Sequence, residues 1–231
     1  MIQAKIVAGS KNPFNDKKLV TFQLRYPRII HAEMLTHSML VRNSASSRAI
    51  PVSKMIEHVK KNMFVPLGVQ KSHKGMQGLD YFTGKELEQV TQAWIESAEL
   101  AIQQAEKMEK MGVTKQLCNR LLEPFEYIDV VISGTEWENF FSLRAPQYKY
   151  SYDGKTYRSK KDYLENCRLV KFDTKDPIEW LKINESQAEI HIQAIAEKMW
   201  DLYNEYDFKM LEPGDYHLPF IEIEEDTFLL K

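Results

Sequence analysis

The sequence has few cysteines and no long apolar run. Cys118 and Cys167 are its two cysteines in 231 residues, and they form neither a CxxC pair nor a spacing typical of zinc ligands. The N-terminal segment does not resemble a signal peptide, and no run of 18 apolar residues could span a membrane. These absences argue against a zinc module and a membrane protein, and they favour a folded, soluble protein of the reducing cytoplasm.

The sequence also has no large excess of either charge. Its 31 basic and 33 acidic residues give a formal charge of −2. A protein that binds nucleic acid by neutralising many phosphates carries more positive charge than this, so we expect no nucleic-acid partner, whereas small anions remain plausible ligands. The six histidines form no HExxH or similar set, and we predict no metal site.

Residue periodicity predicts one α+β domain with a mixed or antiparallel sheet flanked by long helices. Strand-like alternation occurs at 2–8, 18–26 and 126–135, and helical spacing occurs at 51–62, 85–111, 136–144 and 190–203. The helix at 85–111 is long enough to be the structural spine. Asp153-Gly154 between tyrosine-rich segments predicts a type I′ hairpin, and Cys118 is predicted to be a small core residue.

A polar cluster follows the apolar segment that ends near Leu35. The stretch HSMLVRNSASSRAIP, residues 37–51, contains two arginines, four serines and an asparagine. Guanidinium groups, short hydroxyl side chains and accessible backbone N–H groups are the donors that bind anions such as phosphate. A solvated turn with helix caps has the same composition, so composition alone leaves both interpretations open.

This cluster resembles the signature of the flavin-dependent thymidylate synthases, especially their divergent phage and bacterial forms. The family signature reads Arg-His-Arg, seven residues, then Ser-x-Arg, with an asparagine midway. Here His37, Asn43, Ser46 and Arg48 agree with it in identity and spacing, whereas Thr36 and Ser38 replace both signature arginines. The resemblance implies that position 38 lies near the flavin, and Arg42 is the nearby residue that could compensate.

Further blocks resemble the same family in the same order along most of the chain. They are NRLLEP, TEWENFFSLRA, SQAEIHIQAIAEKM, YHLPF and the loop KGMQG. A difference lies between Arg144 and Gln187, where about forty residues replace a short link and Glu185 stands where the family usually has a histidine. We predict a single domain over residues 1–231 with an insertion at about 146–184, which could be a lid, an oligomer contact or a specificity element.

The resemblance implies a role for each matching residue. His37, Asn43, Asn139 and Arg42 are the predicted FAD contacts. The predicted contacts to dUMP are Arg48 and Arg120 at its phosphate, with Ser46, Ser47, Glu33 and Gln187. Arg144 and Ser46 are the predicted catalytic residues: Arg144 stabilises negative charge on the pyrimidine ring, and Ser46 contacts the nucleotide without attacking it.

The implied reaction transfers a one-carbon unit from methylenetetrahydrofolate to C5 of dUMP, with reduced FAD as hydride donor and NADPH as reductant. The family shares each active site among subunits, so a homotetramer in a bacterial or phage-infected cell is expected. Ser38 and the insertion leave two alternatives open. One is a hydroxymethylase of dUMP or dCMP that serves modified phage DNA, and the other is a nucleotide-binding homologue without catalysis.

Overall fold

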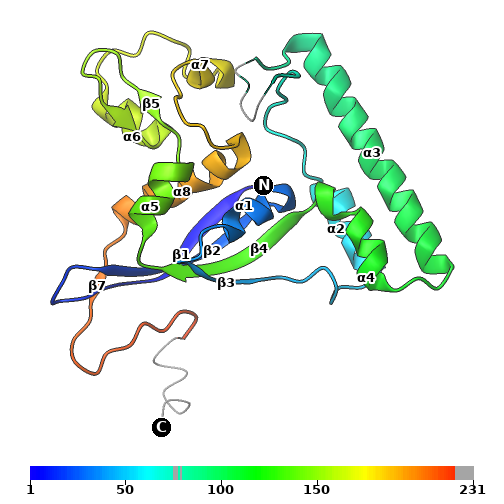
Figure 1. Cartoon of the computed structure of the whole chain (residues 1–231), viewed down its shortest axis with the longest axis horizontal. Coiled ribbons are helices and arrows are strands. Elements are labelled where there is room, and N and C mark those ends of the chain that lie inside the picture. The colour runs from blue at the N-terminus through cyan, green and yellow to red at the C-terminus, as the bar shows by residue number, and fades with distance from the viewer. Residues whose placement is uncertain (75–77, 79, 222–231) are drawn as a thin grey trace.

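The computed structural model describes residues 1–74, 78 and 80–221, and its centre is one mixed sheet of five strands (Figure 1). The strand order is β3-β4-β2-β1-β7. Neighbouring strands are antiparallel, except that β7 runs parallel to β1. The strands are β1 (Gln3–Lys11), β2 (Lys18–Pro27), β3 (Val41–Ser44), β4 (Tyr127–Gly134) and β7 (Lys209–Met210). The α+β class predicted from the sequence is confirmed.

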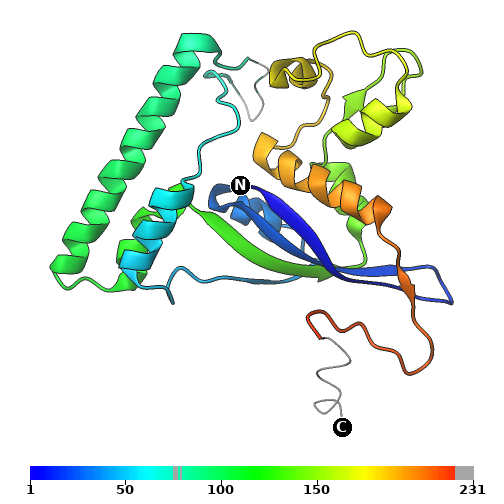
Figure 2. The same cartoon turned by 180° about the vertical axis from the view of Figure 1, so that it is seen from behind.

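One face of this sheet carries the main hydrophobic core. Val20, Phe22, Leu24 and Tyr26 alternate along β2 and are almost fully buried, as the two-residue period of a strand requires. Two helices cover this face, α5 (Trp137–Arg144) and α8 (Ile190–Glu205), and Figure 2 shows α8 lying across it. Both helices and the strands β1, β2 and β4 were predicted.

Short helical segments connect β2 to β3. The 3₁₀ helix η1 (Arg28–Ile30) leads into the short helix α1 (His31–Leu35). On the opposite sheet face, the C-terminal segment YHLPF contacts the strands through His217. Its ring nitrogens lie 2.7 Å from Ser10 Oγ and 2.9 Å from Thr21 Oγ1. This segment therefore covers part of the polar face. The loop KGMQG, in contrast, lies largely outside the described residues.

A second hydrophobic cluster joins three helices at one side of the sheet. The helices are α2 (Val52–Asn62), α3 (Gly84–Lys110) and α4 (Lys115–Cys118), followed by η2 (Asn119–Leu121) and η3 (Glu123–Phe125). Cys118 is fully buried here, as predicted. The interpretation of α3 as the structural spine is wrong, because α3 packs on α2 and α4 and lies apart from α8 (Figure 1). The central helix of the main core is α8.

The insertion folds around a third cluster of its own. It contains β5 (Tyr148–Lys149), β6 (Thr156–Tyr157), α6 (Lys160–Asn166) and α7 (Pro177–Lys182), with Tyr163 and Trp180 at the centre. The predicted hairpin is present, but residues 150–155 separate its strands instead of a two-residue turn. Gly154 has a φ of +69° in this loop, a conformation that glycine adopts without steric cost.

No helix in the described ranges combines the length and the apolar character needed to cross a bilayer.

Candidate functional site

The polar stretch 37–51 forms a loop, an edge strand and a second loop. The strand β3 pairs with β4, and its side chains alternate between the two sheet faces. Arg42 points to the helix-covered face, where its guanidinium donates hydrogen bonds to the carbonyl oxygens of Leu35 (2.7 Å), His37 (2.9 Å) and Leu40 (2.8 Å). These bonds fix the loop after α1. These bonds use three of the five N–H groups of the guanidinium, and the flavin contact of Arg42 stays a prediction.

Arg144 and residues of the first loop form a polar cluster at the beginning of β3. Arg144 ends α5, and its Nε donates to Nε2 of His37 over 3.0 Å. Its Nη2 lies 3.4 Å from Thr36 Oγ1, and its Nη1 lies 3.7 Å from Glu33 Oε2. The ring of His37 packs edge-on against Phe140 at 5.0 Å. The structure thus brings Arg144 beside Glu33 and His37, although it lies 107 residues after His37 in the sequence.

The electrostatics of this cluster favour a neutral imidazole. Burial lowers the pKa of His37, and the charges of Arg144 and Arg42 lower this pKa further. Since Nε2 accepts a hydrogen bond from Arg144, the proton of the neutral ring belongs on Nδ1. Burial and the nearby charge of Glu189 raise the pKa of Glu33, whereas Arg144 and His191 lower it. The cluster can therefore offer N–H donors from Arg144 and His37 to an acceptor oxygen.

The predicted cofactor residues Asn43 and Asn139 are both exposed. Asn43 points to the sheet face opposite Arg42, and Asn139 lies on α5. Within the described residues, neither amide side chain makes a hydrogen bond to another protein group. The structure leaves both available to a ligand but does not join them to Arg144.

A second group of predicted residues lies beyond the other end of β3. Arg48 Nη2 donates to Gln116 Oε1 over 3.2 Å, and its backbone N–H lies 3.3 Å from Ser46 Oγ. Arg120 Nη1 contacts both carboxylate oxygens of Glu123, at 2.9 and 3.0 Å. The loop that carries Arg48 therefore packs beside the segment that carries Arg120.

Glu123 is the centre of this second group. Its Oε1 also accepts a hydrogen bond from Ser47 Oγ (2.7 Å) and forms an ion pair with Arg28 Nη2 (2.9 Å). A hydroxyl and two guanidinium groups around one carboxylate oxygen form a donor set that would also bind a phosphate oxygen. Asn119 stabilises the arrangement, because its Nδ2 donates to the carbonyl oxygens of Ser47 and Ile50.

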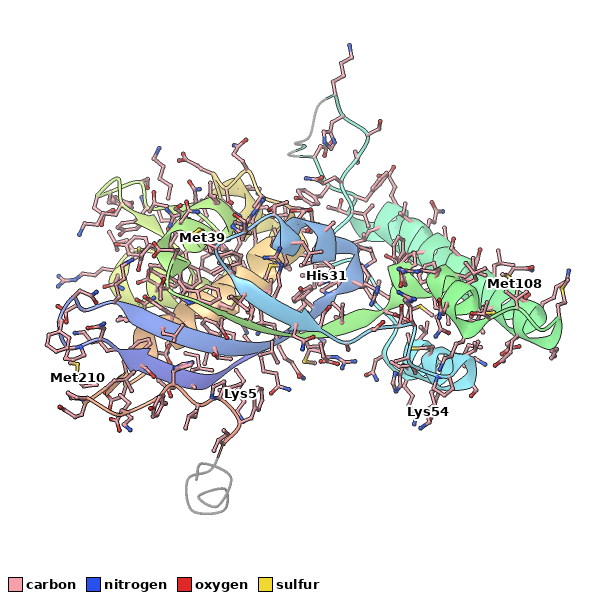
Figure 3. The ribbon with its side chains drawn as sticks, turned by 60° about the horizontal axis from the view of Figure 1, so that its bottom comes forward. Lys5, His31, Met39, Lys54, Met108 and Met210 are labelled. Carbon is pink, nitrogen blue, oxygen red and sulfur yellow. The ribbon has the colours of Figure 1, made fainter. Side chains whose placement is uncertain are left out.

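The two groups lie at opposite ends of β3 within one chain. The strand alone spans roughly 10 Å, from the usual rise per residue, and loops extend beyond it at both ends. Figure 3 shows this separation, since Met39 lies before the strand and Lys54 lies on α2 after it. One chain therefore does not place Arg144 beside Arg48 and Arg120.

A large cleft opens between the insertion, the loop before α3 and the beginning of α8. Its volume is about 1040 Å³, and it is lined by Gln147, Tyr81, Leu181 and the predicted substrate residue Gln187, among others. It also reaches Glu189, whose charge acts on Glu33. The insertion thus contributes one wall of a cleft close to the Arg144 cluster.

Sequence reasoning missed three charged residues, Arg28, Glu123 and Glu126. In the segments YPRII and LEPFE each charge stands beside a proline or apolar residues, but this local context does not distinguish a buried charge from an exposed one. Glu126 is 5% exposed, and its Oε1 has no hydrogen-bond partner among the described residues. Burial raises the pKa of Glu126 to about 7, with a further increase from Glu123 and an opposing effect of Arg28.

Comparisons with known proteins give a fold likeness and no close relative. No protein-family model and no curated protein matches the chain. A crystal structure of the UMP/dUMP methylase PolB from Streptomyces cacaoi bound with 5-Br UMP matches with a TM-score of 0.58 and 14% identity, covering 91% of this chain and 90% of that chain. A structure of the same methylase bound with 5-Br dUMP has a TM-score of 0.52 and 14% identity, covering 84% and 67%. At this identity, the likeness shows that the chain shares the methylase's fold.

Proposed function

We propose that the chain is an enzyme that modifies C5 of a pyrimidine nucleotide, and specifically that it methylates dUMP to dTMP. The observation that carries the proposal is Arg144, held by His37 and Glu33 at the end of α5, in a fold similar to that of a UMP/dUMP methylase. The motif resemblance to flavin-dependent thymidylate synthases supports the finer assignment. Methylenetetrahydrofolate would supply the carbon, and NADPH would be the reductant.

The residues around Arg144 fit the ring of a flavin better than its pyrophosphate. His37 presents an edge of a partly buried imidazole, and the exposed amides of Asn43 and Asn139 are open to a ligand. These donors suit the carbonyl and nitrogen acceptors of the flavin ring. Ser38 and the engaged Arg42 leave the pyrophosphate without an obvious cation from the same loop. A reduced flavin held there would supply the hydride.

In this proposal the protein positions and polarises the nucleotide. Arg144 would donate to a uracil carbonyl oxygen and stabilise negative charge on the ring while C5 acts as the nucleophile toward the electrophilic one-carbon unit. His37 accepts from Nε and so fixes the plane of the guanidinium. Arg48 and Arg120 would bind the phosphate, a task suited to planar bidentate donors, and Ser46 and Ser47 are the further predicted substrate contacts. Gln187 would contact the substrate from the cleft.

The separation of the two groups indicates how a complete site could form. A phosphate bound near Arg120 and a pyrimidine bound near Arg144 belong to one nucleotide only if different chains contribute the two ends. The proposed assembly is therefore a homo-oligomer, with a tetramer expected from the resemblance. This arrangement lets each nucleotide bridge copies of the chain.

The first experiment is to purify the protein with and without added FAD, record its visible absorption, and then add dUMP. A flavin band that shifts with dUMP, followed by formation of dTMP with methylenetetrahydrofolate and NADPH, is the expected result. A colourless protein that binds dUMP and forms no product would favour the non-catalytic homologue.

A hydroxymethylase is the second candidate, and the wide cleft favours it. The cleft is lined by polar side chains, including Gln147 and Glu189, and it could admit water close to the Arg144 cluster. Mass spectrometry of the product separates the two reactions, because a hydroxymethyl product retains one oxygen more than dTMP. Assays with dUMP and dCMP in parallel identify the base.

A further inference from the structure

A separate cavity lies between the sheet and α2, on the side away from Arg144. Its volume is about 310 Å³, at the lower end of the range usual for small-molecule sites. Residues at the end of β2, the beginning of β4 and the inner side of α2 line it. Figure 3 locates α2 by Lys54.

The buried carboxyl group of Glu126 belongs to the lining of this cavity. Only 5% of the residue is exposed, and within the described ranges its Oε1 has no hydrogen-bond partner. A buried polar atom without a partner costs folding free energy. The nearest candidate partner, Arg28, forms its ion pair with Glu123 instead. Oε1 itself is closed off from a water-sized probe, so a ligand in the cavity would donate its N–H group to the carboxyl group at its other oxygen.

The other residues that line the cavity provide hydrogen-bond donors and apolar contacts. Arg25 is held beside the cavity by its ion pair with Asp129, at 2.8 Å. His58 and Asn62 project from α2 at the exposed side, and among the described residues neither side chain is hydrogen-bonded to the protein. Met55 and Ile128 are buried apolar residues of the same lining. A matching ligand has a carbonyl oxygen, an N–H group and apolar faces.

We infer that this cavity binds a planar nitrogen heterocycle, whose N–H edge donates to Glu126 and whose carbonyl oxygen accepts from Asn62 or Arg25. Nucleobases and pterins share this edge, and both are flat enough for Met55 and Ile128 to cover a ring face. The site is separate from the Arg144 cluster, whereas Arg28 and Ser47 of the second group also line the cavity. The inference does not rest on the proposed function.

The test measures binding of guanosine, cytidine and folinic acid to the full chain by ligand-observed NMR and calorimetry. The nucleosides lack the phosphate that Arg48 and Arg120 are proposed to bind, and folinic acid carries the pterin. Binding of a nucleoside, of the folate or of both identifies the source of the heterocycle. E126Q should weaken that binding at least tenfold, because the amide replaces one acceptor oxygen by a donor. N62A should weaken it several-fold.

One control and one second test variant make the result specific. E57Q removes an exposed carboxylate on α2 that pairs with Lys61, and it should leave binding unchanged. N62A alters an exposed position, so it tests the cavity even if E126Q fails to fold. The inference is wrong if no probe binds at millimolar concentration, if E126Q and N62A bind like the unmodified protein, or if R144A abolishes binding while E126Q does not.

Discussion

Glu126 makes the stability of this protein depend on pH. A carboxyl group whose pKa is about 7 in the folded chain, against an ordinary 4.5, holds its proton more tightly when folded. Its contribution to stability is therefore complete below pH 4.5 and is lost as the pH rises toward 7. From the size of this pKa difference, the loss is at most about 3 kcal/mol.

We expect the free energy of unfolding of E126Q, relative to that of the unmodified protein, to increase by about 2 kcal/mol between pH 5 and pH 8. The amide has nearly the same shape and carries no charge to bury. Urea unfolding of both proteins at the two pH values measures the difference. E88Q changes an exposed glutamate on α3 and should show no such trend. An equal pH dependence of E126Q and the unmodified protein would contradict the prediction.

Arg144 is the residue whose removal should affect turnover most. Its side chain is 24% exposed and contacts His37, Thr36 and Glu33. In the proposed reaction, R144A should lower kcat by about a hundredfold or more, the usual effect of removing one donor to developing negative charge. The steady-state rate of dTMP formation at saturating substrate gives kcat. R168A, at an exposed position of the insertion, is the matched control, and comparable rates for R144A and R168A would exclude the assigned role.

At the scale of elements, the insertion has its own core and closely paired ends. Lys149 N donates to the carbonyl oxygen of Ile183, and Glu185 N donates to that of Gln147, both over 2.9 Å. The Asn184 side chain also accepts from Gln147 N and Ser186 N. Because both ends meet at one place, the insertion can lose its packing without pulling the main sheet apart.

W180A should unfold the insertion locally. Trp180 is 3% exposed and packs against Tyr148, Tyr163 and Phe172, so truncation should cost about 3–5 kcal/mol. Hydrogen exchange should then increase over residues 148–183 while β2 and α8 stay protected. W137A, in the main core, should destabilise the whole sheet instead. Uniform loss of protection in W180A would show that the insertion and the sheet unfold together.

The elements also show why part of the fold was predictable. Strand β2 and helices α5 and α8 carry their period within their own residues, so local spacing identified them. β3 has four residues, three of them exposed, and its pairing with β4 comes from contacts distant in sequence. Similarly, the long apolar stripe of α3 indicated a helix but not its partners. Residue periodicity identifies a helix or strand, whereas the position of that element in the fold depends on which other elements it packs against.

The same limit applies to the candidate site. His37 and Arg144 could be named because their motifs resemble a known family, and Glu33 because it lies one helical turn before His37. The structure brings the three together. Glu123 and Glu126 are single glutamates in LEPFE, where nothing local distinguishes an exposed carboxylate from a buried one. Their roles come from Arg28 and Ser47, which lie far away in the sequence. Ion pairs between residues that are distant in sequence therefore could not be predicted from local residue spacing.

At the scale of the whole molecule, β3 separates the two groups of arginines. Arg144 lies with His37 before the strand, and Arg120 lies near Ser47 after it. In the proposed function, two chains contribute the two ends of the nucleotide site. A variant that lacks Arg120 and a variant that lacks Arg144 should then complement one another. In a mixed oligomer, some sites receive an intact Arg120 from one chain and an intact Arg144 from the other.

We expect R120A and R144A each to lose most dTMP-forming activity, and a refolded mixture of the two to regain a substantial fraction. Each variant refolded alone is the control, because recovery there would reflect the refolding step. Native mass spectrometry of differently tagged chains checks that mixed oligomers have formed. If mixed oligomers form and activity stays at the level of the single variants, Arg120 and Arg144 act from the same chain. Arg120 and Arg144 of one chain would then have to move closer together to bind one nucleotide.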